Sequence, residues 1–394
     1  MTALAEEPKL TPPSHVRFEF SKLDPLVRKR LRTLARLDNY HGPLAVLQDF
    51  AVIGLSVYLC VGVSWWFYPL SAILIGSTMR AFANLLHDSA HKMLAKNLRL
   101  NLLLGTVFSG YLILHLINPY RNSHVGGHHR YLGDENLDPD YTFANEIGLY
   151  DHSTPNWKFF SKNLLFAVLG LRTLSYVKYI AKDRIFCKAP TAGADVSMPI
   201  SLRTERIIMF AEWAAIIGLS VAFGWWPYLL LFWVLPMFTT GVAVGWISEL
   251  SEHYPLPESE SKQLLMTRNR HGWAIENFLL GRHHDHYHLV HHLNTGIPSW
   301  HMKQAHQILL ADPAYGAWDA LWAGIFTRGR GRKGKETLIS YASKYRDWRR
   351  NGGDPRTLST TFAEVLTLAN AAGAANTVDV PEAPEYDGTY ANAA

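Results

Sequence analysis

Histidine is concentrated in one short stretch of this 394-residue chain, residues 282–293 (RHHDHYHLVHHL), which holds six histidines within ten residues. A packed core has no need of that density, whereas imidazole is a good ligand for iron, zinc, copper or nickel. If the stretch is helical, His288, His291 and His292 stand at i, i+3 and i+4 and project from one face. His284 would lie one turn earlier on the same side. The spacing therefore predicts a metal site.

Two earlier motifs repeat this spacing, residues 87–91 (HDSAH) and residues 124–129 (HVGGHH). Side chains at i and i+4 converge on one side of a helix. Sixteen of the nineteen histidines fall in residues 87–129 and 253–306, so chance clustering is hard to sustain. The three motifs contribute more histidines than one metal ion of four or six ligands can use, and enough for two. They are His87, His91, His124, His128, His129, His288, His291 and His292.

The ligand type leaves the metal open between zinc and iron. Zinc accepts imidazole readily, but catalytic zinc usually takes three protein ligands. A histidine-rich pair of metals at a membrane surface suits oxygen activation by iron better. Nearby aspartates can accept hydrogen bonds from the ring nitrogens that do not face the metal. The candidates are Asp88, Asp134, Asp138, Asp140 and Asp285.

Two apolar blocks, residues 44–86 and 206–250, predict the helices that position these motifs. Each block is long enough for two spans of about 20 residues, and each is interrupted by a turn that contains Trp and Pro. The first block has no Lys or Arg before Arg80, and the second has none after Arg206. Positive residues collect on the cytoplasmic side of spanning helices, so each block predicts a hairpin with both ends in the cytoplasm. The expected spans are about 44–66, 68–86, 206–223 and 227–250.

Residues 98–117 are apolar enough to form a further span. A crossing there would place residues 124–129 on the opposite side of the membrane from residues 87–91. A shared metal site therefore requires residues 98–117 to be re-entrant or to lie in the interface. Residues 158–180, which are apolar but interrupted by Lys162 and Arg172, are typical of an interfacial helix.

These observations predict an all-α integral membrane protein with four transmembrane helices in two hairpins, interfacial helices and a dimetal site on the cytoplasmic side, in a helical part that the family resemblance described below implies is a cytosolic cap. Residues 1–43 form a basic cytosolic segment, which either touches anionic headgroups or is a solvated charged face. Residues 44–310 form the membrane domain and residues 311–369 the C-terminal part of the cap. Residues 370–394 form a disordered tail.

The net charge of +5 does not indicate a nucleic-acid-binding protein, because the positive residues follow the pattern expected for membrane orientation. Two cysteines provide no disulfide framework, which favours a reducing compartment. The first twenty residues lack the apolar core of a secretory signal. The protein is therefore expected in the membrane, with its active site on the cytoplasmic face.

The three histidine motifs resemble, in order, spacing and position after the hairpins, those of the membrane fatty-acid desaturase and hydroxylase superfamily. The resemblance continues through residues 293–300 (LNTGIPSW) and covers roughly residues 45–310. It implies a mushroom-shaped protein with two iron ions in its cap. In that family, dioxygen and two electrons are used to remove hydrogen from an unactivated C–H bond. Loss of two neighbouring hydrogens gives a double bond, and rebound of oxygen gives an alcohol.

We expect a desaturase that acts on a fatty-acyl lipid chain, because residues 293–300 look most like acyl-lipid desaturases. The alternative on the same scaffold is a hydroxylase or related oxygenase, or an alkene-forming decarboxylase, acting on a fatty acid, an alkane or a carotenoid. An alternative of another class is a non-redox membrane zinc protein. No cytochrome b5 domain is visible at either end, so electrons should come from a separate ferredoxin or rubredoxin with its reductase.

Glu249 and His253, at the end of the fourth expected span, are one helical turn apart and share a face. The resemblance implies that His253 completes a set of nine histidine ligands, with His284 as the next candidate. It places Glu249 where the family often has an Asn that holds a metal-bound water, so Glu249 is a candidate catalytic carboxylate. Alternatively, Glu249 extends to water and His253 caps the helix. A second departure is the Gly126-Gly127 pair, which weakens a regular helix in the second motif.

Overall fold

A computed structural model of the chain describes residues 23–187, 198–258 and 263–355. Within these ranges the chain forms α-helices with short 3-10 and π-helical turns, and its only β-type pairing is an isolated bridge between Trp322 and Glu336. The prediction of an all-α protein is therefore confirmed. The tail predicted at residues 370–394, and residues 1–22 of the basic segment, lie outside the described residues.

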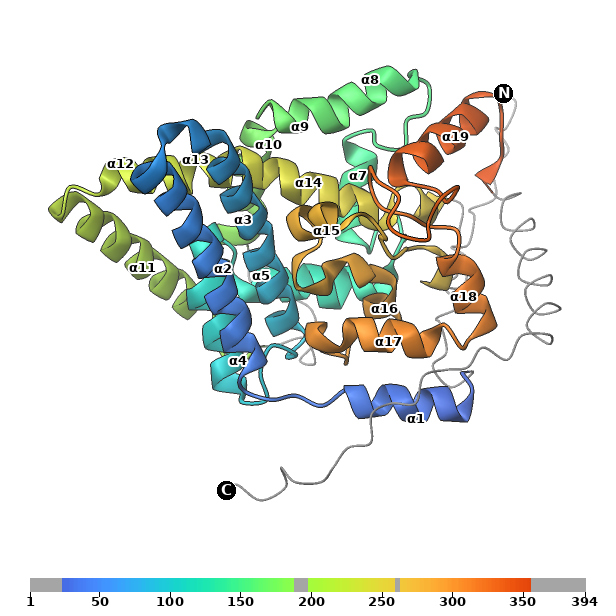
Figure 1. Cartoon of the computed structure of the whole chain (residues 1–394), viewed down its shortest axis with the longest axis horizontal. Coiled ribbons are helices and arrows are strands. Elements are labelled where there is room, and N and C mark those ends of the chain that lie inside the picture. The colour runs from blue at the N-terminus through green and yellow to red at the C-terminus, as the bar shows by residue number, and fades with distance from the viewer. Residues whose placement is uncertain (1–22, 188–197, 259–262, 356–394) are drawn as a thin grey trace, which may run out of the picture.

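Three helical runs are long and apolar enough to cross a membrane: His41–Val63, Trp65–Ala90 and Trp226–Glu258. In the helical core of the molecule, α2 packs along α3, and α3 packs along α14 (Figure 1). The α-helices of these runs are α2 (His41–Tyr58), α3 (Tyr68–Ala90), α12 (Trp226–Leu229), α13 (Leu235–Phe238) and α14 (Thr240–His253).

The first predicted turn is present between the first two runs. The helical path breaks at Ser64, whose backbone is extended and whose side chain accepts a hydrogen bond from the Trp66 N–H. Pro69 then lies in the first turn of α3, where a missing N–H costs no helical hydrogen bond. This local chemistry ends one helix and starts the next, as the sequence predicts.

The helix expected to be the third span is α11 (Leu202–Ala222), which is 21 residues long but is not among the three apolar runs. Its sequence carries Arg203, Glu205, Arg206 and Glu212, which lower its average hydropathy. Glu205 is fully buried, and its carboxylate accepts hydrogen bonds from the backbone N–H groups of Ile117 and Asn118. The four-span topology therefore remains a prediction. The buried Glu205 carboxylate connects α11 to the segment that contains Ile117 and Asn118.

Two further apolar segments are sharply bent. The path from Leu98–Ile113 into Ile117–Tyr131 turns by 97°, and the path from Asn156–Val168 into Thr173–Ile185 turns by 76°. The first bend lies where the sequence requires a re-entrant or interfacial segment. The helices involved are α4 (Leu98–Gly105), α5 (Ile117–Arg121), α6 (His129–Tyr131), α8 (Asn156–Phe160), α9 (Phe166–Val168) and α10 (Thr173–Tyr179).

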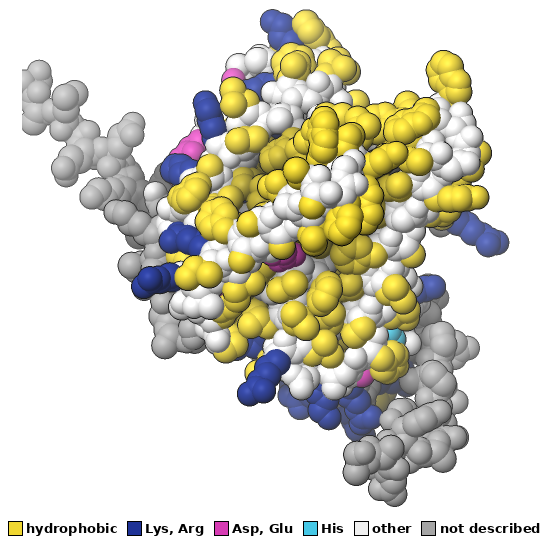
Figure 2. Space-filling view, turned by 90° about the vertical axis from the view of Figure 1, so that its left-hand side faces the viewer, with side chains coloured by type: hydrophobic (Ala, Val, Ile, Leu, Met, Phe, Trp, Pro, Cys, Tyr) yellow, Lys and Arg dark blue, Asp and Glu magenta, His cyan; other side chains and the backbone are white. Residues whose placement is uncertain are grey.

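One face of the molecule is largely apolar. Figure 2 shows hydrophobic side chains gathered over the middle of this face, whereas Lys and Arg lie toward its borders. Large apolar side chains on α2, α11 and α12 are exposed, among them Leu47, Leu219 and Trp226. Exposed apolar surface on this scale indicates contact with lipid or another apolar phase.

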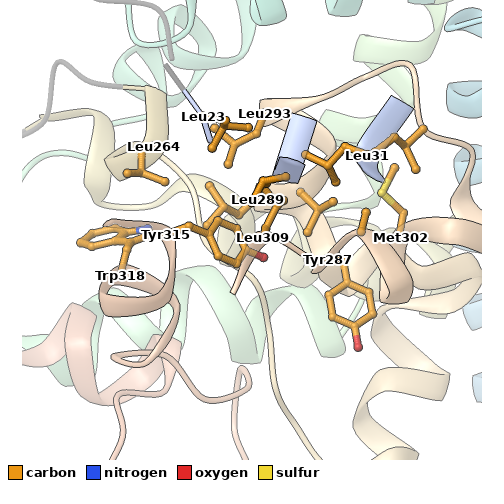
Figure 3. Packing of buried hydrophobic residues seen from close by; sticks show 14 of the residues in the cluster. Leu23, Leu31, Leu264, Tyr287, Leu289, Leu293, Met302, Leu309, Tyr315 and Trp318 are labelled. Atoms are coloured by element: carbon orange, nitrogen blue, oxygen red, sulfur yellow. The ribbon is translucent and has the colours of Figure 1, made fainter. Parts of the chain in front are cut away.

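The helices expected to form the cap have their own hydrophobic core, in which α1 (Pro25–Leu34) packs against the helices that follow the third histidine motif. Figure 3 shows Leu31 of α1 in the same cluster as Leu289, Leu309 and Trp318. Val27 and Leu31 of α1 are buried in this core, whereas Lys29 and Arg32 are exposed, so α1 is amphipathic. The other cap helices are α7 (Pro139–Glu146), α15 (Ala274–Leu280), α16 (His288–Leu293), α17 (Met302–Leu309), α18 (Pro313–Asp319) and α19 (Leu338–Arg350).

Candidate metal centre

Nine imidazoles converge at the junction of α3, α14 and the cap, and they form two groups. Within each group, the ligand nitrogens all lie within 4.8 Å of one another. The structure thus brings together all nine histidines that the sequence analysis selected. The first group is His87, His91, His124, His129 and His291, and the second group is His128, His253, His288 and His292.

The nitrogens of the first group point at one another. The Nε2 atom of His291 lies 2.9 Å from the Nε2 atoms of both His87 and His129, and the Nε2 of His129 lies 2.9 Å from that of His124. A neutral imidazole has one N–H and one lone pair, so such a ring of close nitrogens cannot be satisfied by their own protons alone. The Nε2 of His91 is buried with no hydrogen-bond partner among the described residues. A cation at the centre of this group would supply the missing partner.

The second group has the same character. The Nε2 atom of His253 lies 3.1 Å from the Nε2 atoms of His128 and His288, and the Nε2 of His288 lies 3.1 Å from that of His292. Burial lowers the pKa of His288, His291 and His292 far below the ordinary value, with the neighbouring imidazoles acting in the same direction. These rings are therefore neutral near pH 7, which is the state that binds metal.

The two groups are neighbours because adjacent residues divide between them. His128 and His129 enter different groups, and so do His291 and His292. The rings of His129 and His292 stack across the boundary with centres 4.3 Å apart. The arrangement can hold two metal ions side by side, as the number of histidines predicts.

Hydrogen bonds from outside the two groups orient several of the rings. His128 Nδ1 lies 3.1 Å from the Asp138 carboxylate, His87 Nδ1 lies 3.0 Å from that of Asp88, and His253 Nδ1 lies 3.0 Å from the Met266 carbonyl oxygen. A ring that donates from Nδ1 presents the lone pair of Nε2 to a metal. Asp140 also approaches His128 Nδ1, at 3.4 Å. The other two candidate aspartates have further roles: Asp134 accepts the backbone N–H groups of Asn136 and Leu137, and Asp285, whose carboxylate lies within 4.8 Å of a His288 nitrogen, pairs with Arg270.

Comparison with known proteins agrees with this geometry. A family model described as "Fatty acid desaturase" matches residues 64–321. The chain belongs to the fatty acid desaturase family. It is 38% identical over 314 residues to the dihydrorhizobitoxine desaturase of Bradyrhizobium elkanii, covering 79% of this chain and 87% of that protein.

More distant relatives carry fatty-acid names. The chloroplastic omega-6 fatty acid desaturase of Spinacia oleracea is 23% identical over 267 residues, 67% of this chain and 58% of that protein. The sn-1 oleoyl-lipid 12-desaturase of Anabaena variabilis is 24% identical over 278 residues, 66% of this chain and 73% of that protein. The family and these relatives make the chain a desaturase-type oxidoreductase.

The second motif of this desaturase is a π-helical turn, Asn122–His128. A π-helix brings residues five apart onto one side, so His124 joins His129 in the first group and His128 is free to enter the second. His124 and His128 do converge, with ring centres 5.4 Å apart, but they divide between the two groups. Gly127 permits the close approach of Pro139, because a Cβ at Gly127 would lie 2.7 Å from the proline Cδ.

The helix of the third motif begins only at His288, so the expectation that His284 shares its face is wrong. His283 and His284 have left-handed backbone angles, with φ of 54° and 62°. Asp49 of α2 holds this segment through an ion pair with Arg282 and a 2.8 Å contact with His283 Nε2. The spacing of the histidines in the sequence cannot predict this long-range contact with α2.

Glu249, the candidate catalytic residue, lies outside both histidine groups. Its side chain is 62% exposed, and one carboxylate oxygen lies 3.4 Å from Arg80 Nη1. Sequence analysis missed Glu252, which is buried, pairs with Arg80 at 2.7 Å and lies 3.6 Å from His288 Nε2. Arg80 at the end of the apolar block was the available signal, because a buried arginine needs a carboxylate partner.

A further network supports α16 from the cap side. Asn269 Oδ1 accepts the backbone N–H groups of Leu289 and Val290, and its amide donates to Tyr315 and Asp319. Asp319 also pairs with His271 and with Arg332. His271, His306 and Asp319 are close enough to hold a metal ion, but Arg332 and Asn269 already occupy the Asp319 carboxylate. We therefore interpret this cluster as a support for the third histidine motif.

Proposed function

We propose that the chain is an O₂-dependent desaturase in which nine histidines hold two iron ions and a double bond is introduced into an aliphatic chain. The observation that carries the proposal is the pair of adjacent imidazole groups, which contain five and four converging nitrogens. Hydrogen bonds between the rings cannot satisfy all of these nitrogens, whereas a bound metal ion in each group would. Imidazole suits iron, and the family membership supports redox use of the centre over a zinc hydrolase or a metal carrier.

When bound, the two irons would supply the activation of dioxygen needed to remove hydrogen from an unactivated C–H bond. The protein contributes buried rings, three of which are oriented from behind by Asp88, Asp138 and the Met266 carbonyl. Burial of these rings restricts water at the centre, which limits side reactions. Two electrons per turnover come from an external donor, for which a ferredoxin or rubredoxin with its reductase is our proposal.

The substrate of this chain is a separate question. The relative at 38% identity is named for dihydrorhizobitoxine, whereas the two relatives near 23% are named for fatty-acid or oleoyl-lipid substrates. A fatty-acyl lipid chain therefore remains a prediction. All three relatives are named as desaturases, so they share one reaction type, the loss of two neighbouring hydrogens.

We further propose that the centre faces the cytoplasm. Single cysteines placed at Trp66 and Trp225, in a background lacking Cys187, should react with an impermeant maleimide added to intact cells. Cysteines at Ser153 and Lys344 should react only after the membrane is opened. Labelling of Lys344→Cys in intact cells would contradict this orientation.

The activity is tested with purified, detergent-solubilised protein loaded with ferrous iron. Reduced ferredoxin, dioxygen and a panel of acids, lipids and thioesters would be supplied, and products analysed by mass spectrometry. A product lighter by two hydrogens supports the proposal, whereas a product heavier by one oxygen would identify a hydroxylase. Zinc retained in place of iron, with no oxygen consumption, would exclude both.

A further inference from the structure

Arg80 of α3 holds a buried carboxylate next to the second histidine group. Its Nη2 atom lies 2.7 Å from Glu252 Oε1 and 3.6 Å from Asp285 Oδ2. Arg270 pairs with the same two carboxylates, because its Nη2 atom lies 3.6 Å from Glu252 Oε1 and 2.5 Å from Asp285 Oδ2. All four side chains are at most 12% exposed. Two buried arginines thus balance two buried carboxylates.

The Glu252 carboxylate is close to the second group but is not part of it. Its Oε2 atom lies 3.6 Å from His288 Nε2, which is the atom that faces His253 in the same group. The four ligand atoms that converge in this group are all imidazole nitrogens, whereas Glu252 is gathered with Asp285 and His288. The carboxylate therefore lies beside the place of a metal ion, with its other oxygen held by Arg80.

A carboxylate in this place could become a ligand. The second group offers four imidazoles and the first offers five, and catalytic metal sites keep a coordination position free of protein ligands. Carboxylates are common ligands of non-haem iron, so Glu252 as a fifth ligand would fill such a position. The last torsion of a glutamate side chain is broad, and rotation about it could bring an oxygen toward the imidazoles. The ion pair with Arg80 opposes that rotation.

We propose that Arg80, assisted by Arg270, is a positioning residue that keeps the Glu252 carboxylate off the second metal and so keeps one coordination position of that metal free. This inference rests on the proposed function, because it takes both histidine groups to hold iron. Arginine suits the role, since its guanidinium stays charged and can pair with two carboxylates at once. Without Arg80, Glu252 would be a buried charge with only its longer contact to Arg270, a costly state that binding to the metal would relieve.

Iron binding to the detergent-solubilised protein tests the restraint without turnover. Arg80→Gln should bind the iron of the second group at least about 10-fold more tightly in a chelator competition, the scale on which outer partners change metal affinity. In the Mössbauer spectrum of the iron-loaded protein, the signal that His292→Ala removes should change and the other should not. Turnover should fall, because the free position is filled. Adding Glu252→Gln to Arg80→Gln should restore the wild-type affinity and spectrum.

Glu252→Gln covers the case in which Arg80→Gln fails to fold, because Arg80 keeps Asp285 and Glu249 as partners. Since Glu252 is not a ligand, this variant should keep both irons and change their affinity by less than about 10-fold. Arg80→Lys retains the positive charge and should keep the wild-type spectrum. The melting temperature establishes that each variant is folded.

Glu249→Gln is the matched control. It removes the exposed carboxylate that lies 3.4 Å from Arg80 Nη1 and leaves the buried partner in place. The iron affinity and the spectrum should therefore match those of the wild type.

Two outcomes would overturn the restraint. Loss of iron by Glu252→Gln as large as that in His292→Ala would show that Glu252 is itself a ligand. Unchanged or weaker iron binding by folded Arg80→Gln would show that Arg80 does not hold the carboxylate away.

Product analysis of the wild type separates this failure from failure of the proposed function. If the wild type binds two irons and desaturates but Arg80→Gln binds iron no more tightly, the reaction stands and the restraint falls. If Arg80→Gln binds iron more tightly as expected but the wild type forms no product lighter by two hydrogens, the restraint stands and the desaturase proposal falls.

Discussion

The two histidine groups lie side by side, but they are built differently. The first has five imidazoles, and Asp88 is the carboxylate hydrogen-bonded to one of its rings. The second has four imidazoles, and it is held by buried Asp138, by the Met266 carbonyl and by Glu252 close to His288. Metal binding by the first group should therefore depend mainly on the number of its ligands, and metal binding by the second group on the orientation of its rings. The two metals should respond differently to the same kind of substitution.

The largest expected effect comes from removing a ligand at the shared helix α16. His292→Ala leaves three imidazoles in the second group, whereas His291→Ala leaves four in the first. Both variants should lose turnover by at least about 100-fold, since outer partners alone are worth about 10- to 100-fold. Iron per protein, measured by elemental mass spectrometry, should fall further in His292→Ala. His301→Ala, outside both groups, is the control, and wild-type iron in both ligand variants would disprove the site.

The variants Asp138→Asn and Asp88→Asn compare how strongly the second and the first group depend on the orientation of a histidine ring. Asp138 is 1% exposed, and its second oxygen accepts the Gly133 N–H, so it has no freedom to adjust. Asp138→Asn should lower iron affinity or activity by about 10- to 100-fold, and Asp88→Asn by less. A chelator competition measures both affinities. A larger loss in Asp88→Asn would reverse the contrast between the groups.

The support behind α16 is tested by Asn269→Ala. This variant leaves the backbone N–H groups of Leu289 and Val290 buried without their acceptor, at about 1–3 kcal/mol for each unsatisfied group. The free energy of unfolding should fall accordingly, and iron should fall in both groups because α16 serves both. Tyr315→Phe removes one hydroxyl of the same network and should cost less. An unchanged melting temperature in Asn269→Ala would show that this network does not hold the helix.

The smallest expected effect is a pH dependence. Burial lowers the pKa of His306 to about 4, so the folded state favours its neutral form. The stability that depends on this neutral ring is complete above the unfolded pKa of about 6.5 and is lost as the pH falls toward 4, at about 1.4 kcal/mol per pH unit. His306→Phe should therefore reduce the loss of stability between pH 7 and pH 5, measured by thermal unfolding. An unchanged slope would mean that His306 does not titrate in this range.

The histidine motifs predicted eight of the nine imidazoles that converge, because ligand chemistry and helical spacing are local properties, and the family resemblance added His253. The sequence also predicted the turn before α3, since Pro69 and the adjacent aromatics act within a few residues. The all-α class followed from long apolar runs with basic ends. In each case the physical cause lies within about one helical turn or one span of the residues concerned.

Only the tertiary structure decided how the histidines divide. The π-helical turn at His124 depends on packing of Gly127 against Pro139 of α7, and the start of α16 depends on Asp49 of α2. Arg80 selects Glu252 as its buried partner and leaves Glu249 exposed, a choice set by the rotation of α14 against α3. These are contacts between segments far apart in the chain, and burial, not spacing, determines which of two similar side chains reaches the site.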